Sequence, residues 1–153
     1  MSAGEICTAW NNVDVVFGAW GAQAAAAARM LAVDEEGRPR AMARANLSDR
    51  GDYVWYTECD LFDTELYIHN KKHDLWLSYD EEGNVLLLPN KTNNSGWTVL
   101  ADSLDLVEIE PSLTIDACVS LFLTLFADGN VSLAPRTDHN NVSATTILKM
   151  TVV

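Results

Sequence analysis

The feature that most constrains the fold is a short motif that occurs three times at one spacing. An acidic turn closed by glycine reads VDEEGRPRAMA at 33–43, YDEEGNVLLLP at 79–89 and LFADGNVSLAP at 125–135. Consecutive glycines of the motif lie 46 residues apart, at Gly37, Gly83 and Gly129. A fixed period of this length is typical of chains that are built from equivalent structural units. The sequence therefore predicts three such units.

Apolar residues flank each of these glycines at alternate positions. Six residues before the glycine stand Leu31, Leu77 and Leu123, and four residues after it stand Ala41, Leu87 and Leu133. A period of two is typical of a strand with one buried face. A glycine at the turn permits the backbone conformation of a tight hairpin. Each unit is therefore expected to contribute a β-hairpin.

Two further strands are expected in each unit, one before the hairpin and one after it. We predict the earlier strands at 14–20, 65–70 and 112–117 and the later strands at 53–58, 96–101 and 145–150. In the first unit, 5–10 competes with 14–20, and Ala24 to Ala28 is expected to form an inserted loop or helical turn. Trp55 and Ile147 both lie 18 residues past the glycine of their unit.

Three four-stranded units predict an all-β fold, the β-trefoil, in which a six-stranded barrel is capped by three hairpins. A propeller is excluded because propellers need about four blades or more. A chain of 153 residues buries one substantial core, so we predict a single domain. Its three lobes are expected at approximately 1–60, 61–106 and 107–153.

The charge of the chain narrows the range of partners. A net charge of −12, from 22 acidic and 10 basic residues, argues against nucleic acid and against an anionic membrane surface. No apolar run is long enough for a membrane-spanning helix. The first residues have neither a basic segment nor an apolar segment of a signal peptide, so we expect a cytoplasmic protein.

Cysteine and histidine usage predicts neither a disulfide framework nor a metal site. Cys7, Cys59 and Cys118 are an odd number at wide spacing, which favours buried free thiols. His69 and His73 have helical metal-ligand spacing, but they lie where a strand passes into a loop. No nucleophile motif is present. We therefore expect no metal, no cofactor and no catalytic residues.

Two stretches resemble known β-trefoil families. LWLSYDEEGNVLLLPNKTNNSGWTVL, at 75–100, resembles a unit of the fascin-like and hisactophilin-like β-trefoils. LFLTLFADGNVSLAPRTDHNNVSATTILKM, at 121–150, is similar to the closing lobe of the fibroblast growth factors. Trp55 and Trp97 stand where trefoil lectins place the tryptophan of their Gln-x-Trp motif. These resemblances imply the fold, together with either actin binding or carbohydrate binding.

The first functional hypothesis is a non-enzymatic, lectin-like protein that binds carbohydrate through lobe pockets. Aromatic platforms and polar turn residues would form the site, and the candidates are Trp76, Tyr79, Trp97, Asp80, Glu82 and Asn84. A possible ladder of guanidinium groups on the first unit would bind an anion, through Arg38, Arg40 and Arg44. Core packing of Trp76 and Tyr79, and ordinary ion pairs of the arginines with 34–36, are the structural alternatives.

Two other functions stay open, and both take a protein as ligand. One is a fascin-like actin-binding or scaffolding protein. The other is a protease inhibitor that presents the loop at 89–96 or the loop at 135–143, with Lys91 or Arg136 as the residue offered to the protease. A flexible loop without a disulfide is costly to order on binding.

Overall fold

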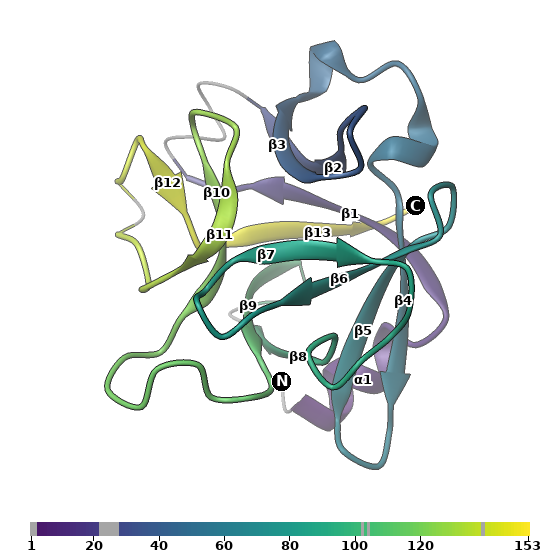
Figure 1. Ribbon diagram of the computed structural model, residues 1–153, viewed down its shortest axis with the longest axis vertical. Helices are drawn as coiled ribbons and strands as arrows, with labels where there is room; N and C mark the ends of the chain where they lie inside the picture. The colour runs from purple at the N-terminus through teal and green to yellow at the C-terminus, as the bar shows by residue number, and fades with distance from the viewer. Residues whose placement is uncertain (1–2, 22–27, 102, 104, 139) are drawn as a thin grey trace.

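Most of the regular secondary structure of the protein is β-strand. The computed structural model describes residues 3–21, 28–101, 103, 105–138 and 140–153. Helical structure within these residues is confined to α1 (Ala3–Ala9) and two 3₁₀ turns, η1 (Arg44–Asn46) and η2 (Arg50–Asp52). No helix in these ranges has the length and apolar character that crossing a membrane requires. The all-β prediction is confirmed (Figure 1).

Six strands pair in a closed antiparallel ring. In order around the ring they are β1 (Val13–Ala19), β4 (Trp55–Asp60), β5 (Glu65–Asn70), β8 (Trp97–Ala101), β9 (Leu106–Pro111) and β13 (Leu148–Val152), which pairs again with β1. Alternation explains why these sequences line a barrel: in β5, Leu66 and Ile68 point inward and are buried, while their neighbours are partly exposed. The ring is therefore a six-stranded barrel around one apolar core.

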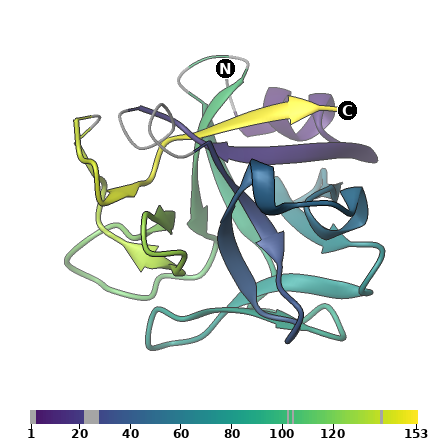
Figure 2. The same ribbon diagram turned by 90° about the horizontal axis from the view of Figure 1, so that it is seen from above.

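Three hairpins cover the barrel. They are formed by β2 (Arg29–Val33) with β3 (Pro39–Ala43), β6 (Leu75–Tyr79) with β7 (Val85–Leu88), and β10 (Phe122–Phe126) with β11 (Val131–Ala134). In Figure 2 the hairpins, coloured blue, teal and green, occupy separate sectors of the molecule. A short strand, β12 (Ala144–Thr145), pairs with β10. The repeated glycine turns thus lie where the 46-residue period places them.

Two buried tryptophans anchor two of the hairpins to the barrel. Trp55 and Trp97 are both 0% exposed, and their indole N–H groups donate to the carbonyl oxygens of Leu31 and Leu77 at 3.0 Å. The third unit has Leu148 at the equivalent place, because Leu148 pairs with Val107 as Trp55 pairs with Val15. The residue equivalent to Trp55 is therefore Leu148, one residue after the predicted Ile147.

Two strand predictions need correction. The predicted strand at 112–117 is a loop, and the first strand of that unit is β9, where Val107 and Ile109 alternate with outward residues. The competing first strand at 5–10 falls mostly in helix α1, so β1 is the strand of the first unit. The expected insertion at Ala24 to Ala28 lies outside the described residues, apart from Ala28.

The cysteine prediction is wrong. Cys7 on α1 and Cys59 on β4 form a disulfide, with their Cα atoms 5.3 Å apart, and Cys118 is free but exposed. The pairing arises because helix α1 packs against β4 and β8, which brings residues 52 positions apart into contact. The disulfide therefore fastens the first helix to the barrel wall.

Candidate functional site

The repeat places one outward residue at the same position in each unit. Phe17, Ile68 and Ile109 are buried on the first barrel strands, and the residues that follow them face outward: Gly18, His69 and Glu110. Each is paired with a residue on the last strand of the preceding unit, in the pairs Gly18 with Lys149, His69 with Tyr56, and Glu110 with Thr98. In the second and third units the chain that follows, at 71–74 and at 112–121, leads to the hairpin. These three places are the candidate sites.

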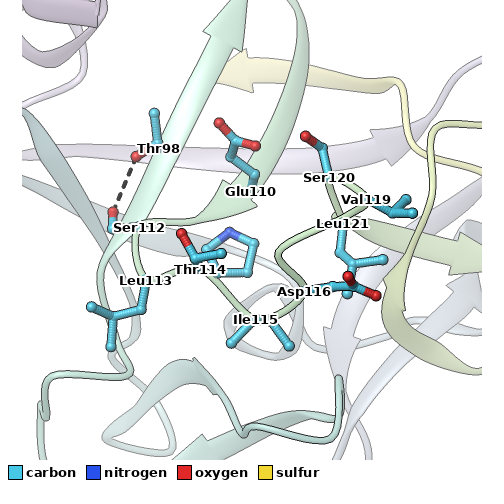
Figure 3. Close-up of a pocket in the computed structure, with 11 residues that line it drawn as sticks. Thr98, Glu110, Ser112, Leu113, Thr114, Ile115, Asp116, Val119, Ser120 and Leu121 are labelled. Atoms are coloured by element: carbon cyan, nitrogen blue, oxygen red, sulfur yellow. Dashed lines mark hydrogen bonds between the residues drawn. The ribbon is translucent and has the colours of Figure 1, made fainter.

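The pocket at the third place has the most polar lining, and we call it the Glu110 pocket (Figure 3). Its volume is about 180 Å³, and it is enclosed by β8, β9 and the loop at 112–121. Two carboxylates and four hydroxyls line it, from Glu110, Asp116, Thr98, Ser112, Thr114 and Ser120. The rest of the lining is apolar and comes from Pro111 at the end of β9 and from the loop, through Leu113, Ile115, Val119 and Leu121. Hydrogen-bonding and apolar groups thus lie side by side.

The loop of the Glu110 pocket is held by buried groups behind it. The Tyr79 hydroxyl donates to the Gly96 carbonyl at 2.9 Å and accepts from the Leu113 N–H at 3.3 Å. The Ser112 N–H donates to the same Gly96 carbonyl at 3.0 Å. Ile115 and Leu121 are partly buried against the core. These contacts fix the lining before any ligand binds.

Burial controls the electrostatics of the pocket. Partial burial raises the pKa of Glu110; the neighbouring charge of Arg136 opposes this shift and that of Glu108 adds to it. Arg136 donates through Nε to Glu108 at 2.6 Å, so its charge is largely directed to that carboxylate. Thr98 and Ser112 share a hydrogen bond of 3.1 Å between their hydroxyls (Figure 3). The pocket therefore offers acceptors and reorientable hydroxyls, with no cation among the residues that line it.

The first place is an open groove of about 320 Å³, which we call the Trp20 groove. Gly18 has no side chain to fill it, and Trp20 borders it with 42% of its surface exposed. Its basic residues are Arg29, Arg44 and Lys149, and the Lys149 ammonium lies 5.8 Å from the centre of the Trp20 ring. The first and third places thus have opposite charge.

The second place is filled by stacked aromatic rings, which we call the His69 stack. The His69 and Trp76 rings stack with centres 4.2 Å apart, and Tyr56 pairs with His69 on the neighbouring strand. Lys91 lies 5.2 Å from the centre of the Trp76 ring. The short turn at 71–74 brings Trp76 directly against His69. Trp76, predicted as a ligand platform, is the partly exposed member of the predicted aromatic set.

The other two predicted aromatic residues belong to the core. Tyr79 is 1% exposed and Trp97 is 0% exposed, and their rings meet edge to face with centres 4.9 Å apart. Neither ring presents a face to a ligand, so the core alternative describes Tyr79 and holds for Trp97 as well. Their connection to a site is indirect, because both lie behind the Glu110 pocket: Tyr79 bonds its loop, and Trp97 pairs with Pro111.

The predicted polar residues of the second hairpin build its turn. Asp80 accepts from the backbone N–H groups of Glu82 and Asn84 at 2.9 Å and from the Asn84 side chain at 2.8 Å. The hydrogen bonds from the side chain and then the backbone of Asn84 lower the pKa of Asp80. Glu82 is exposed at the tip of the turn. Asp80 and Asn84 therefore bond each other within the turn.

The predicted arginine ladder is divided between two places. Arg38 pairs with Asp34 at 3.0 Å and with Glu36 at 3.1 Å, as the ion-pair alternative expects. Arg40 donates to Asn130 of the third hairpin at 2.9 Å. Arg44 lies in η1, past the end of β3, and lines the Trp20 groove. The strand ends one residue before Arg44, which is why the three guanidinium groups do not form one row.

The residues proposed for the other functions are engaged in local contacts. Lys91 lies 3.7 Å from the Glu58 carboxylate and 4.5 Å from the centre of the Tyr67 ring, and Arg136 bonds Glu108. His69 and His73 bond Asp74 and Asp52, each at 2.8 Å. Within the described ranges, no group of three or more histidine, cysteine or acidic side chains is arranged to hold a metal ion.

Sequence reasoning missed most of the residues that line the two open sites. Glu110 and Thr98 were not singled out, because 112–117 was expected to be a strand and its loop was not anticipated. The signal that could have found this loop is Pro111 together with the alternation of Val107 and Ile109, which places the strand six residues earlier. Arg29 and Lys149 become neighbours only when β13 pairs with β1.

Comparison with known proteins identifies the fold and no family. No protein-family model matches the chain, and no curated protein matches its sequence. Among solved structures, the chain is similar to the lectin SeviL, in a structure described as SeviL bound to asialo-GM1 saccharide. The TM-score is 0.65, and the match covers 92% of this chain and 98% of that chain. At 7% identity, this likeness shows that the two chains share a fold.

Proposed function

We propose that the chain is a β-trefoil that binds carbohydrate, without catalysis, at the Glu110 pocket. The observation that carries this proposal is the convergence of two carboxylates and four hydroxyls on one small cavity that also has apolar walls. A sugar ring has hydroxyl groups around its edge and apolar C–H groups on its faces. Carboxylate oxygens accept hydrogen bonds from hydroxyls, and hydroxyl side chains both donate and accept. The two kinds of lining therefore match the two kinds of sugar surface.

The size and rigidity of the pocket suit a small ligand. At about 180 Å³ it is smaller than the roughly 300–1,000 Å³ of pockets for drug-sized molecules. One sugar ring or the end of a longer saccharide is the ligand that we expect. Because Tyr79 and Ser112 hold the loop in place, little ordering is left to be done on binding, which favours affinity.

The fold supports the same proposal. SeviL has been solved bound to the asialo-GM1 saccharide, so a chain with a similar arrangement of strands holds a saccharide. The barrel with three hairpins is the arrangement expected of a β-trefoil. At the Glu110 pocket we expect a neutral sugar, because two carboxylates would repel an anionic ligand.

The test is binding of neutral sugars by two variants that differ in one position. Saturation-transfer NMR with galactose, N-acetylgalactosamine, glucose, N-acetylglucosamine, mannose and fucose would identify the preferred ring. Glu110→Gln is expected to weaken that binding about tenfold or more, because a hydrogen bond to a charged group is worth roughly 1.5–3 kcal/mol. Glu82→Gln is the matched control, since it makes the same change at an exposed turn.

Two results would contradict the proposal. One is that none of the six sugars shows saturation transfer to the folded protein. The other is that a sugar binds and the two variants bind it equally well, which would place the site elsewhere. Urea denaturation in which neither variant is less stable than the wild type would confirm that altered binding does not come from unfolding.

A further inference from the structure

The Trp20 groove brings together cations that form no ion pair with the residues that the structure describes. It lies where β13, β1 and β2 run side by side, and Arg29, Arg44 and Lys149 border it. In the described part of the chain, ion pairs join other basic residues to carboxylates, as with Arg38, Lys72 and Arg136, but none involves these three. One groove thus gathers three cations that form no ion pair within the described ranges, in a chain of net charge −12.

Neighbouring groups hold the two guanidinium groups in place. Arg29 donates through Nη1 to the Ala41 carbonyl at 2.8 Å. Arg44 donates through Nη1 to the Leu47 carbonyl at 3.2 Å, and its Cζ atom lies 4.7 Å above the Tyr53 ring. Because their positions are set by protein groups, these side chains lose little freedom when an anion binds.

One nitrogen of Arg29 has no hydrogen-bond partner in the part of the chain that the structure describes. Its Nε atom is buried, and among the described residues it forms no hydrogen bond. A buried donor without an acceptor costs free energy. The atom has almost no accessible surface, so an anionic oxygen in the groove would become its acceptor only after a shift of the Arg29 side chain.

The remaining lining is apolar. Trp20 is exposed, and Val16, Ala19 and Met30 contribute apolar groups to the same groove. An exposed indole face is suited to contact with the apolar face of a sugar ring. Binding of small inorganic anions alone would not require an exposed apolar surface in the groove.

We infer that the Trp20 groove binds an acidic saccharide, with the sugar ring against Trp20 and its carboxylate or sulfate group among Arg29, Arg44 and Lys149. The inference rests on the proposed carbohydrate binding and adds a second specificity to it. The Glu110 pocket and the Trp20 groove are equivalent positions of the repeat, and Gly18 stands where Glu110 stands in the third unit. Opposite charge at equivalent positions would let one chain bind a neutral sugar and an acidic sugar at once.

The test compares three probes that share one disaccharide: 3′-sialyllactose, which carries a carboxylate, 3′-sulfolactose, which carries a sulfate, and lactose, which is neutral. Tryptophan fluorescence reports binding because Trp20 is exposed, while Trp76 is only partly exposed and the other tryptophans, Trp10, Trp55 and Trp97, are buried. Trp20→Phe assigns the signal to the groove. We expect one or both acidic probes to bind about tenfold more tightly than lactose, since a charge-assisted hydrogen bond is worth about one tenfold step or more.

Two variants remove the site without disturbing the fold. Lys149→Gln removes an exposed ammonium, and we expect about tenfold weaker binding of the acidic probes. Gly18→Glu adds a carboxylate inside the groove, and we expect it to abolish that binding. A Cβ atom at Gly18 would lie 3.8 Å from the Arg29 carbonyl oxygen and 4.0 Å from that of Lys149, so it fits. Arg38→Gln, a loss of charge outside the groove, is the control and should change nothing.

The outcomes separate this inference from the proposed function. The acidic site alone would be overturned by two results together. Neutral sugars would bind the wild type but not Glu110→Gln, and the acidic probes would bind no more tightly than lactose. No binding of any saccharide, neutral or acidic, would overturn both. Inorganic sulfate that gives the same affinity and the same fluorescence change as 3′-sulfolactose would overturn the saccharide part, because the groove would then be a site for anions only.

Discussion

At the scale of single residues, the three units carry side chains of different chemistry at one outward position. Gly18, His69 and Glu110 occupy it, each beside a buried apolar residue of its strand. A glycine leaves an open groove, a histidine stacks on Trp76, and a glutamate forms the base of a polar pocket. The barrel tolerates all three because this side chain points away from the core. The shape and charge of the surface therefore vary at a position that the fold does not constrain.

Glu110 is expected to lower stability at neutral pH. Burial raises the pKa of its carboxyl group in the folded state, so the folded protein holds this proton at pH values where the unfolded chain has lost it. The free energy of unfolding therefore falls as pH rises from the unfolded to the folded pKa. Glu110→Gln has no carboxyl group at this position, so its free energy of unfolding does not fall in this way. In urea titrations it should be more stable than the wild type at pH 7, and the difference should close as pH falls below about 4. A difference that widened at low pH would contradict this account.

Tyr79 is expected to be a positioning residue of the Glu110 pocket. Tyr79→Phe deprives the Gly96 carbonyl and the Leu113 N–H of a buried partner, which should cost about 1–3 kcal/mol. The loop at 112–121 should loosen, so hydrogen exchange at Leu113 should accelerate and sugar affinity should fall. Tyr56→Phe, which loses an exposed hydrogen bond to Asn12, is the control. Unchanged exchange at Leu113 would argue against this role.

At the scale of secondary-structure elements, the three hairpins lock together through their turns. The Ala41 N–H on β3 donates to the Gly129 carbonyl at 2.9 Å, and the Leu133 N–H on β11 donates to the Gly83 carbonyl at 3.0 Å. A bridge between Asn84 and Ser132 joins the second hairpin to the third. Gly83 and Gly129 thus lie at the turns of their hairpins and also accept a hydrogen bond from the neighbouring hairpin.

The glycine turns differ in what surrounds them. Gly83 and Gly129 have φ of +85° and +98°, so alanine at either should cost about 1–2 kcal/mol. At Gly129 a Cβ atom would also lie 2.6 Å from Nη2 of Arg40, which bonds Asn130. Gly129→Ala should therefore be more destabilising than Gly83→Ala by about 0.5–1.5 kcal/mol. When both glycine substitutions are made in an Arg40→Ala background, urea denaturation should give equal losses of stability. A larger loss for Gly129→Ala that persisted there would show another cause.

The strands that the sequence located well are those with a strong local signal. The 46-residue period and the alternation around each glycine placed all three hairpins, since a tight turn needs glycine and one face of each strand is buried. Strand β9 was missed because the loop at 112–121 lengthens the unit without any glycine of its own. Loop length is a property on which local periodicity gives no information.

At the scale of the whole molecule, a disulfide closes the N-terminal helix onto the barrel. The pair of Cys7 and Cys59 could not be predicted from spacing, because only the packing of α1 against β4 and β8 brings them together. Disulfides are typical of oxidising compartments, so this pair weighs against the expected cytoplasmic location. The same limit applies to the two open sites, whose residues come from strands of different units.

The disulfide predicts both a thiol count and a loss of stability. The unreduced protein should have one reactive thiol, Cys118, and the reduced, denatured protein should have three. Because the bridge spans 52 residues, its removal in Cys59→Ser should cost roughly 4 kcal/mol, the value of a chain-entropy estimate for a loop of that size. Cys118→Ser should cost almost nothing. Three reactive thiols in the native protein would contradict the pairing.

The central claim is that this chain binds saccharides, and that the lobes differ in what they bind. A glycan array that carries neutral and acidic saccharides tests it most directly, with wild type, Glu110→Gln and Lys149→Gln side by side. We predict that the wild type binds defined glycans of both kinds, that Glu110→Gln loses the neutral ones, and that Lys149→Gln weakens the acidic ones. An array on which the folded wild-type protein binds no glycan would contradict the claim.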